Sequence, residues 1–269
     1  MSQKHESKAT LGLTEPELQL LEVGAGPTAR RIAFRGLSGA GPGLVWLPGF
    51  KSDMTSTKAV ALNDYCIAKE RALLRFDYSG HGASSGEFEA GTISRWLEES
   101  LSVFRARTSG PQILVGSSMG GYLALLLARQ LAALNEAGRL SGMILIAPAV
   151  DFTERLIWER ASDEVRQTIT HFGRWLRPTP YASQFYPITR NLIEDGRRHL
   201  LLDRPIRTHA PTRILQGMLD EDVPHRHVQR LVEHVAGDPV TLTLVRDGDH
   251  RLSRPQDLAM LINAVEALS

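Results

Sequence analysis

Cysteine and long apolar runs are scarce in this sequence, and each scarcity excludes a class of protein. Cys66 is the one cysteine among 269 residues, so no internal disulfide can form and a reducing compartment is expected. No run reaches the ~18 apolar residues of a membrane span, and the N-terminal segment has acids but no apolar signal region. The sequence therefore predicts a soluble, cytoplasmic protein without a membrane span, with Cys66 as a buried structural thiol.

Charge of one sign is also not concentrated anywhere. The 31 Lys and Arg residues against 30 Asp and Glu leave a net charge of +1, with no long run of either sign. Nucleic acids and anionic membrane surfaces select basic patches, so neither is expected as a partner. With 42% hydrophobic residues, the chain is also not of the disordered class.

Short apolar runs alternate with amphipathic stretches of helical length, which is typical of a mainly parallel sheet with crossover helices. The expected strands are 31–35, 44–47, 72–76, 112–115, 143–147, 212–216 and 241–245. The expected helices are 57–69, 92–107, 119–135, 225–235 and 255–268. A glycine-rich segment, 36–43, has the composition of a phosphate loop but no Gly-Lys-Ser/Thr and no following helix, so a hairpin turn is expected there. The pattern predicts a single α/β domain over residues 1–269.

The alternation breaks between residues 151 and 210, where no strand-like run is found, and we expect a helical lid insertion there. Apolar residues with helical spacing occur within it at Val165, Ile169, Phe172 and Leu176. This spacing predicts an amphipathic helix. Seven aromatic residues also fall in the segment: Phe152, Trp158, Phe172, Trp175, Tyr181, Phe185 and Tyr186. They either pack the insertion onto the main domain or line a pocket for an apolar substrate group.

A serine-containing turn follows the strand expected at 112–115. The chain continues as Gly116-Ser117-Ser118-Met119-Gly120-Gly121 into an apolar helical stretch. A nucleophile at the apex of a strand-turn-helix unit needs small neighbours, because strand and helix pass close on both sides, and the glycines supply that room. The helix N-terminus also favours developing negative charge. We therefore predict that Ser118 is a catalytic nucleophile.

A serine hydroxyl requires a base and an acid that orients the base. His250 follows the last expected strand, and Asp220 follows the strand at 212–216. We predict that His250 takes the Ser118 proton and that Asp220 orients the ring. Other acids are given other interpretations: Asp222 caps the next helix, and Asp151 remains an alternative acid. Asp247 and Asp249 are turn residues.

A metal site is the competing interpretation of the same region. The possible ligands are Asp220, Asp222, His225 and His227. The two histidines lie two positions apart on an expected helix, so they point to different faces. No metal ion or other cofactor is therefore expected.

The negative charge of an acyl-transfer intermediate needs two backbone N–H donors. Met119, which follows the nucleophile, offers one. Phe50, in the Pro48-Gly49-Phe50 loop after the strand at 44–47, is predicted to offer the other.

Taken together, these motifs resemble the α/β-hydrolase superfamily over nearly the whole chain. The resemblance is carried by the Phe50 loop, the 76–82 turn with Ser84, the Ser118 elbow, the 217–224 loop and Asp249-His250. More narrowly, LPGFKSDMTSTKA, RFDYSGHGASSG, QILVGSSMGG and DGDHRLS are similar to the abhydrolase branch that includes the mitochondrial protein depalmitoylase and acyl-glucuronide esterase. Many superfamily members carry His-Gly where this chain has Pro48-Gly49, but a backbone donor tolerates that change.

The resemblance implies an α/β-hydrolase fold and a serine hydrolase that cleaves the ester or thioester bond of a small-molecule or acylated substrate. The same triad could serve an acyltransferase or a peptidase, and some proteins of this fold bind ligands without catalysis. His81, in the 76–82 turn, is interpreted as structural. An arginine cluster either receives a substrate carboxylate or is solvated: Arg197, Arg198, Arg204, Arg207 and Arg213. Nothing in the sequence favours a particular oligomeric state.

Overall fold

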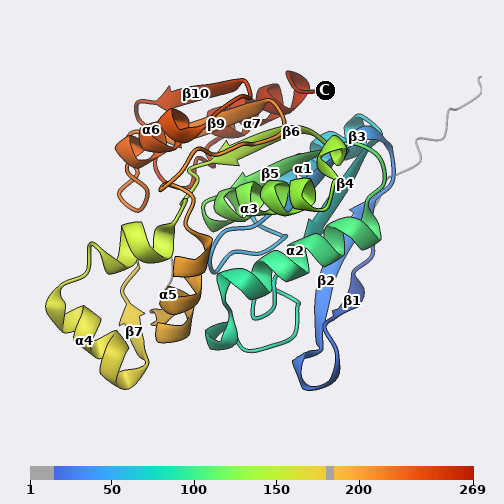
Figure 1. The fold of residues 1–269 in the computed structure, drawn as a ribbon. Coiled ribbons are helices and arrows are strands. Elements are labelled where there is room, and N and C mark those ends of the chain that lie inside the picture. The colour runs from blue at the N-terminus through green and yellow to red at the C-terminus, as the bar shows by residue number, and fades with distance from the viewer. Residues whose placement is uncertain (1–14, 180–184) are drawn as a thin grey trace, which may run out of the picture.

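The computed structural model describes residues 15–179 and 185–269, and its centre is an eight-stranded sheet (Figure 1). The strand order is β1-β2-β4-β3-β5-β6-β9-β10. These strands are β1 (Gln19–Val23), β2 (Arg30–Leu37), β3 (Ala40–Leu47), β4 (Arg71–Phe76), β5 (Gln112–Ser117), β6 (Leu140–Ile146), β9 (Thr212–Gly217) and β10 (Val240–Val245). The β1–β2 and β2–β4 pairs are antiparallel and the other pairs parallel, so β2 alone runs against the rest.

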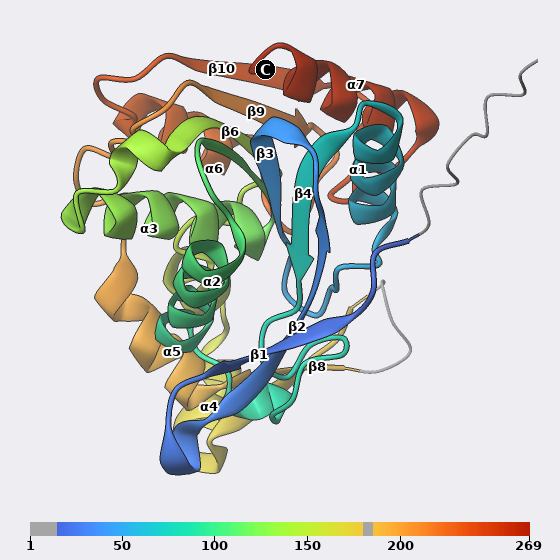
Figure 2. The same cartoon turned by 90° about the vertical axis from the view of Figure 1, so that its right-hand side faces the viewer.

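Helices cover both faces of the sheet (Figure 2). One face carries α1 (Thr57–Ala68) and α7 (Pro255–Glu266), and the other carries α2 (Ile93–Arg107), α3 (Met119–Ala133) and α6 (His225–His234). Each face has its own hydrophobic core. Because the central strands are buried on both sides, β5 is buried at every position, and its apolar residues Ile113, Leu114 and Val115 are consecutive. The expected mostly parallel α/β fold is confirmed.

Cys66 lies on α1 within one of these cores and is fully buried. Burial raises the pKa of its thiol to about 12, which suits an inert structural residue. None of the helices in the described ranges is sufficiently long and apolar to span a membrane.

The N-terminal half departs from expectation in two places. The sequence pattern does not predict β1, because this edge strand has mostly exposed residues and no clear apolar alternation. The hairpin predicted at 36–43 is wrong: β4 lies between β2 and β3, and both pair with it. A short connection brings two strands near each other, but the long-range pairing of β4 decides which strands are neighbours.

The segment between β6 and β9 extends beyond the sheet and lies apart from it in Figure 1. It contains the π-helix η4 (Thr153–Trp158), α4 (Asp163–Phe172), β7 (Arg174–Arg177), β8 (Tyr186–Thr189) and α5 (Arg190–Gly196). The expectation of no strand here is wrong, because β7 and β8 form an antiparallel pair. Gly173, in the left-handed region at φ +79°, ends α4, so Leu176 lies on β7 and not on the predicted helix with Val165 and Ile169.

Two buried carboxylates hold this segment: Asp151 joins its beginning to its end, and Asp195 attaches it to the main domain. Asp151 accepts hydrogen bonds from the backbone N–H groups of Leu201 (2.8 Å) and Leu202 (2.9 Å). Asp195 accepts from the N–H and hydroxyl of Ser94 at the start of α2, both at 2.8 Å. The segment is therefore fixed at the carboxyl end of the sheet, where the catalytic candidates also lie.

Candidate active site

Ser118 occupies a sharp turn between β5, which ends at Ser117, and α3, which begins at Met119. Its backbone is at φ +54°, ψ −118°, a strained conformation for a residue with a side chain. The Ser118 N–H donates to the Ile146 carbonyl at 2.8 Å. The Ser118 carbonyl accepts from Gly121 (3.0 Å) and Ala149 (3.1 Å). These bonds hold the strained turn in place, and the Ser118 side chain borders a cavity.

Glycine at position 120 makes this turn sterically possible. A Cβ atom on Gly120 would lie 2.0 Å from the Leu47 carbonyl oxygen, which belongs to the neighbouring strand β3. That contact is with backbone, so it cannot be relieved by rotating a side chain. The turn can therefore approach β3 only with glycine at this position.

We expect Gly120→Ala to destabilise the protein by roughly 1–3 kcal/mol, because the methyl group must displace β3. Gly138→Ala is the matched control, since a Cβ atom there meets nothing within 4 Å. Its effect should stay within about 0.5 kcal/mol. Urea unfolding of the two variants measures the difference. Equal stabilities would contradict the proposed steric requirement at Gly120.

The structure brings Ser118, His250 and Asp220 together in one hydrogen-bonded chain. His250 Nε2 lies 3.1 Å from Ser118 Oγ, and His250 Nδ1 lies 2.8 Å from Asp220 Oδ2. The Asp220 side chain is completely buried and that of His250 is 16% exposed. A carboxylate only accepts, so Nδ1–H donates to Asp220 and Nε2 is left to face the serine hydroxyl. This is the arrangement in which imidazole can remove the serine proton.

Two further donors hold the Asp220 carboxylate. Its Oδ1 accepts from the Val223 N–H at 2.8 Å, and its Oδ2 accepts from Gln216 Nε2 at 3.1 Å. Gln216 is fully buried at the end of β9 and was missed as a functional residue. The available signal was a polar residue directly after the apolar pair Ile214-Leu215 and four positions before the acid.

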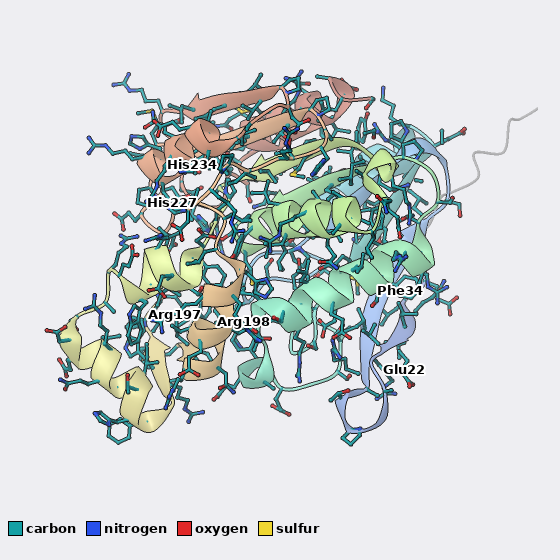
Figure 3. All side chains as sticks on the ribbon, in the orientation of Figure 1. Glu22, Phe34, Arg197, Arg198, His227 and His234 are labelled. Carbon is teal, nitrogen blue, oxygen red and sulfur yellow. The ribbon has the colours of Figure 1, made fainter. Side chains whose placement is uncertain are left out.

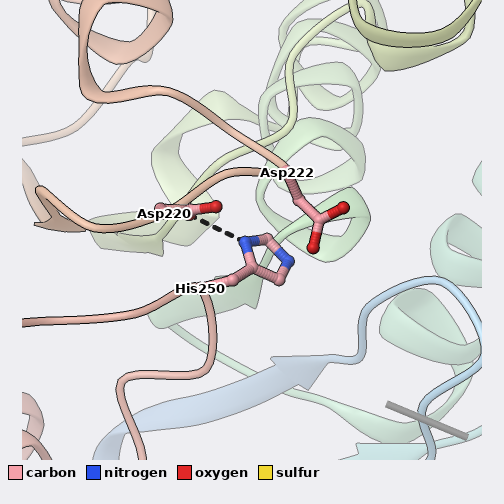
Figure 4. A group of neighbouring side chains, drawn as sticks. All are labelled: Asp220, Asp222 and His250. Carbon is pink, nitrogen blue, oxygen red and sulfur yellow. Dashed lines mark hydrogen bonds and ion pairs between the residues drawn. The ribbon is translucent and has the colours of Figure 1, made fainter. Parts of the chain in front are cut away.

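Asp222 lies on the other side of the His250 ring from Asp220 (Figure 4). Its predicted capping role is wrong: α6 has Pro224 at its N-cap and no side-chain cap bond. Asp222 instead accepts a 2.7 Å hydrogen bond from Arg177 on β7. Arg160 of the insertion also donates to the Asp222 carbonyl, so this residue is bonded to the insertion and not to the helix.

The alternative acid, Asp151, is occupied elsewhere by the N–H groups of Leu201 and Leu202. Asp247 pairs with Arg254, and Asp249 accepts from N–H groups two and three residues later, as turn residues do. Of these acids, Asp220 is therefore the one that accepts a hydrogen bond from His250 Nδ1.

The candidate metal-ligand set is not assembled as the sequence allowed. His227 turns its Nε2 to the Val150 carbonyl at 2.8 Å. In residues 15–179 and 185–269, the group whose ligand atoms lie within 4.8 Å of one another is Asp220, Asp222 and His250. Each of these side chains already has a protein partner in the bonds given above.

Phe50 and Met119 border the same cavity as Ser118. Met119 is the first residue of α3, and an N–H group at that position has no acceptor within its own helix. The Phe50 ring packs edge-on against Phe88 and Trp96, with centroids 4.9 and 6.0 Å apart, and this packing fixes the loop after β3.

His81 belongs to that aromatic cluster and not to the hydrogen-bonded chain of Ser118. Its ring lies 5.0 Å from Phe88 and 5.3 Å from Trp96, and Nδ1–H donates to the Ser79 carbonyl at 3.2 Å. Burial lowers the pKa of His81 to about 4, so the ring is neutral near pH 7. Its surroundings are those of a packing residue.

A cavity of about 640 Å³ opens in front of Ser118 and His250. One wall, mainly from the insertion, is apolar and consists of Phe152, Leu156, Ile157, Phe185, Tyr186 and Ile188. A second group of lining residues comes from the loop after β3 and the start of α1 and is polar: Lys51, Ser52, Asp53, Thr55, Ser56, Thr57 and Lys58. The volume falls within the roughly 300–1,000 Å³ of small-molecule sites.

The aromatic residues of the insertion divide between the two roles considered for them. Phe152, Phe185 and Tyr186 line the cavity, whereas Trp158 and Trp175 pack against the core. Phe172 is 81% exposed and serves neither role. Tyr181 lies outside the described residues.

The arginine cluster lies away from the cavity. Figure 3 labels Arg197 and Arg198. Arg197 pairs with Glu154 at 2.7 Å, and Arg198 pairs with Asp195. No member of the cluster is among the described residues that line the cavity. A carboxylate on a substrate bound beside Ser118 would therefore not meet it.

The chain belongs to the alpha/beta hydrolase family and is a hydrolase: the family's sequence model matches residues 38–261. The mitochondrial palmitoyl-protein thioesterase ABHD10 of Homo sapiens is 32% identical over 243 residues, which cover 90% of this chain and 78% of that protein. The Mus musculus protein is 34% identical over 238 residues, covering 88% and 78%. These relatives confirm the branch that the motifs indicated.

Solved structures agree with this family assignment. A putative hydrolase from Agrobacterium vitis S4 has a TM-score of 0.91 and 46% identity, covering 95% of this chain and 99% of that chain. Mouse alpha/beta hydrolase domain-containing protein 10 has a TM-score of 0.84 and 32% identity, covering 94% and 98%. The esterase Est1E of Butyrivibrio proteoclasticus, solved with ferulic acid, shares the fold at a TM-score of 0.69 and 18% identity.

Proposed function

We propose that this hydrolase cleaves carboxylic esters or thioesters through a covalent acyl-enzyme on Ser118. The observation that carries the proposal is the hydrogen-bonded chain from Ser118 Oγ through His250 to the buried Asp220, at 3.1 and 2.8 Å, on the floor of a cavity. That chain supplies a nucleophile, a base and an orienting acid in the geometry that acyl transfer requires.

The proposed reaction has two halves. Ser118 Oγ forms a bond to the substrate carbonyl carbon while its proton passes to His250 Nε2, and the N–H groups of Phe50 and Met119 hold the oxyanion. The intermediate collapses as His250 returns the proton to the departing oxygen or sulfur. Water then attacks the acyl-enzyme with His250 again as base, and Ser118 is regenerated with release of the carboxylic acid.

The substrate class is supported by the two unlike walls of the cavity. The insertion supplies an apolar wall that suits a hydrocarbon acyl group, while the 51–58 segment is polar and suits a hydrated leaving group. The named activity of the relatives, hydrolysis of palmitoyl-protein thioesters, involves a substrate divided in the same way. We propose that the insertion, residues 151–210, acts as the lid that encloses the acyl group.

We expect turnover across a panel of p-nitrophenyl esters and acyl thioesters, from acetyl to palmitoyl, with a preference for acyl chains longer than acetyl because the apolar wall buries each added methylene. The measurement is kcat/KM for each member, with Ser118→Ala run in parallel. Cleavage of the thioesters without cleavage of the esters would narrow the proposed substrate class to thioesters. Failure on the entire panel, with Ser118 also inert toward a fluorophosphonate, would overturn the proposal in favour of a binding protein.

A further inference from the structure

The turn that carries His250 lies outside any helix or strand, between β10 and α7, and its position depends on bonds to other elements. On one side of His250, the Gly248 carbonyl accepts from the Leu219 N–H at 2.9 Å. Leu219 precedes Asp220, so this bond couples the turn to the acid. On the other side, the Arg251 carbonyl accepts from Lys58 Nζ. The turn is thus held by a hydrogen bond on each side of His250, and Lys58 donates the one that comes from α1.

Lys58 makes a second contact in the same turn, with Ser253 Oγ at 3.3 Å. The Ser253 hydroxyl in turn donates to the Arg251 carbonyl at 3.0 Å. Within this turn Leu252 has φ +44°, a strained value for a residue with a branched side chain. The ammonium group therefore binds a strained segment immediately after the histidine.

The placement of Lys58 is costly for α1 itself. Lys58 is the second residue of that helix, where the positive end of the helix dipole repels a cation. The residue is only 9% exposed, although its side chain borders the cavity. A buried cation at a helix N-terminus is unfavourable unless its hydrogen bonds compensate. The bonds that compensate are those to the His250 turn.

α1 begins just after the 48–56 loop, which carries the Phe50 N–H. A bond from α1 to the turn after His250 therefore links the oxyanion side of the site to the base side. We propose that Lys58 is a positioning residue, which holds His250 in line with Ser118 by binding the Arg251 carbonyl and the Ser253 hydroxyl. The inference rests on the proposed function, since it assigns a role in the reaction of the same site.

The bond should weaken at alkaline pH. Burial lowers the pKa of Lys58 to about 8, Asp249 and Asp257 oppose that shift, and Arg251 adds to it. From the sheet, the apolar Ile146 and Leu215 border the same small cleft as Lys58. Loss of the proton replaces a charge-assisted hydrogen bond by a weaker neutral one. The hold on the turn should therefore be strong below the pKa of Lys58 and decrease as pH rises through it.

The test compares wild type, Lys58→Met and Lys69→Met between pH 6 and 10, on the best ester of the panel. Lys69 directly follows α1 at its other end and pairs with Glu266 on the surface at 3.7 Å, so Lys69→Met controls for removal of a lysine without contact to the His250 turn. We expect Lys58→Met to lose roughly 10- to 100-fold in kcat, because a small displacement of a catalytic group costs rate. Lys58 also borders the cavity, so KM can rise in this variant, but the loss in kcat should be the larger of the two effects.

The rate of fluorophosphonate labelling of Ser118 should fall in Lys58→Met by the same factor as kcat. Wild type and Lys69→Met should both lose activity several-fold above pH about 8, a decline that Lys58→Met should lack. Wild-type kcat and an unchanged alkaline decline in Lys58→Met would overturn the inference. If Lys58→Met does not fold, Lys58→Arg is tested in its place. The guanidinium stays charged up to pH 10, so the alkaline loss of activity should disappear in this variant. An alkaline loss equal to that of wild type would overturn the positioning role of Lys58.

The proposed function and this inference fail in different ways. Turnover that persists in Ser118→Ala would refute the serine mechanism whatever Lys58 does. A Lys58→Met protein with wild-type kinetics, beside an inactive Ser118→Ala protein, would refute only the positioning role.

Discussion

Ser118→Ala should reduce kcat by a factor on the order of 10⁶, the largest loss expected for any single substitution here. In the proposed mechanism the hydroxyl is the atom that bonds to the substrate carbonyl, so without it the remaining groups can only orient a water molecule in its place. A small residual rate over uncatalysed hydrolysis should remain, because the proposed oxyanion donors, the Phe50 and Met119 N–H groups, are unchanged in this variant.

The fold should tolerate this change, so the loss can be assigned to chemistry. Alanine keeps the Cβ atom, and the bonds of the Ser118 backbone to Ile146, Gly121 and Ala149 are unaffected. The measurements are single-turnover kinetics on the best substrate of the panel, circular dichroism and thermal unfolding. A folded variant that keeps more than about a hundredth of wild-type kcat would show that another nucleophile acts.

The positions of the catalytic candidates could be predicted because each one follows a strand. Ser118, Asp220 and His250 come after β5, β9 and β10, and the carboxyl ends of parallel strands meet at one edge of a sheet. Their spacing in the sequence, 132 positions between Ser118 and His250, does not matter once the strand order is known. Local patterns predict the strands, and the parallel topology of those strands then brings the three residues to one edge of the sheet.

Contacts that depend on side-chain reach could not be predicted in this way. The Arg177–Asp222 pair joins a short strand of the insertion to the acid loop, and Lys58 meets the His250 turn from 193 positions away. The sequence gives no sign of either contact, because Asp222 has the position of a helix cap and Lys58 that of a residue on a solvated helix face. Their roles arise only when the insertion and α1 are packed against the sheet edge.

The structure of the insertion is also poorly predicted by its sequence, because it depends on contacts with other elements. Its strands β7 and β8 are four residues each, so alternation has little length in which to appear. The apolar spacing from Val165 to Leu176 continues across Gly173, although that glycine ends the helix. Phe172, at the end of α4, points into solvent where the periodicity predicts burial. Short elements take their structure from their partners more than from their own pattern.

Asp220→Asn should lower kcat by a factor on the order of 10⁴, and this loss should identify the orienting acid. The carboxylate accepts from His250 Nδ1, Gln216 Nε2 and the Val223 N–H. An amide has one oxygen and one NH₂ group, so at least one of these donors then faces another donor. If the NH₂ group faces Nδ1, the ring adopts the tautomer with its proton on Nε2 and can no longer accept the Ser118 proton.

Asp222→Asn is the matched control, because it removes the same charge two residues away and beside the same imidazole ring. Its amide oxygen can still accept the hydrogen bond of Arg177, so we expect a loss of less than about tenfold. The comparison is made on kcat at pH 7 and on the rate of Ser118 labelling, with unfolding curves to confirm that both variants fold. Equal losses would mean that the two carboxylates share the work of holding His250, whereas a larger loss for Asp222→Asn would transfer the orienting role to that residue. We expect the loss in kcat to be much larger for Asp220→Asn than for Asp222→Asn. Asp220 is buried, accepts from three donors and bonds directly to Nδ1, whereas a carboxylate on the Nε2 side of the ring cannot select the reactive tautomer.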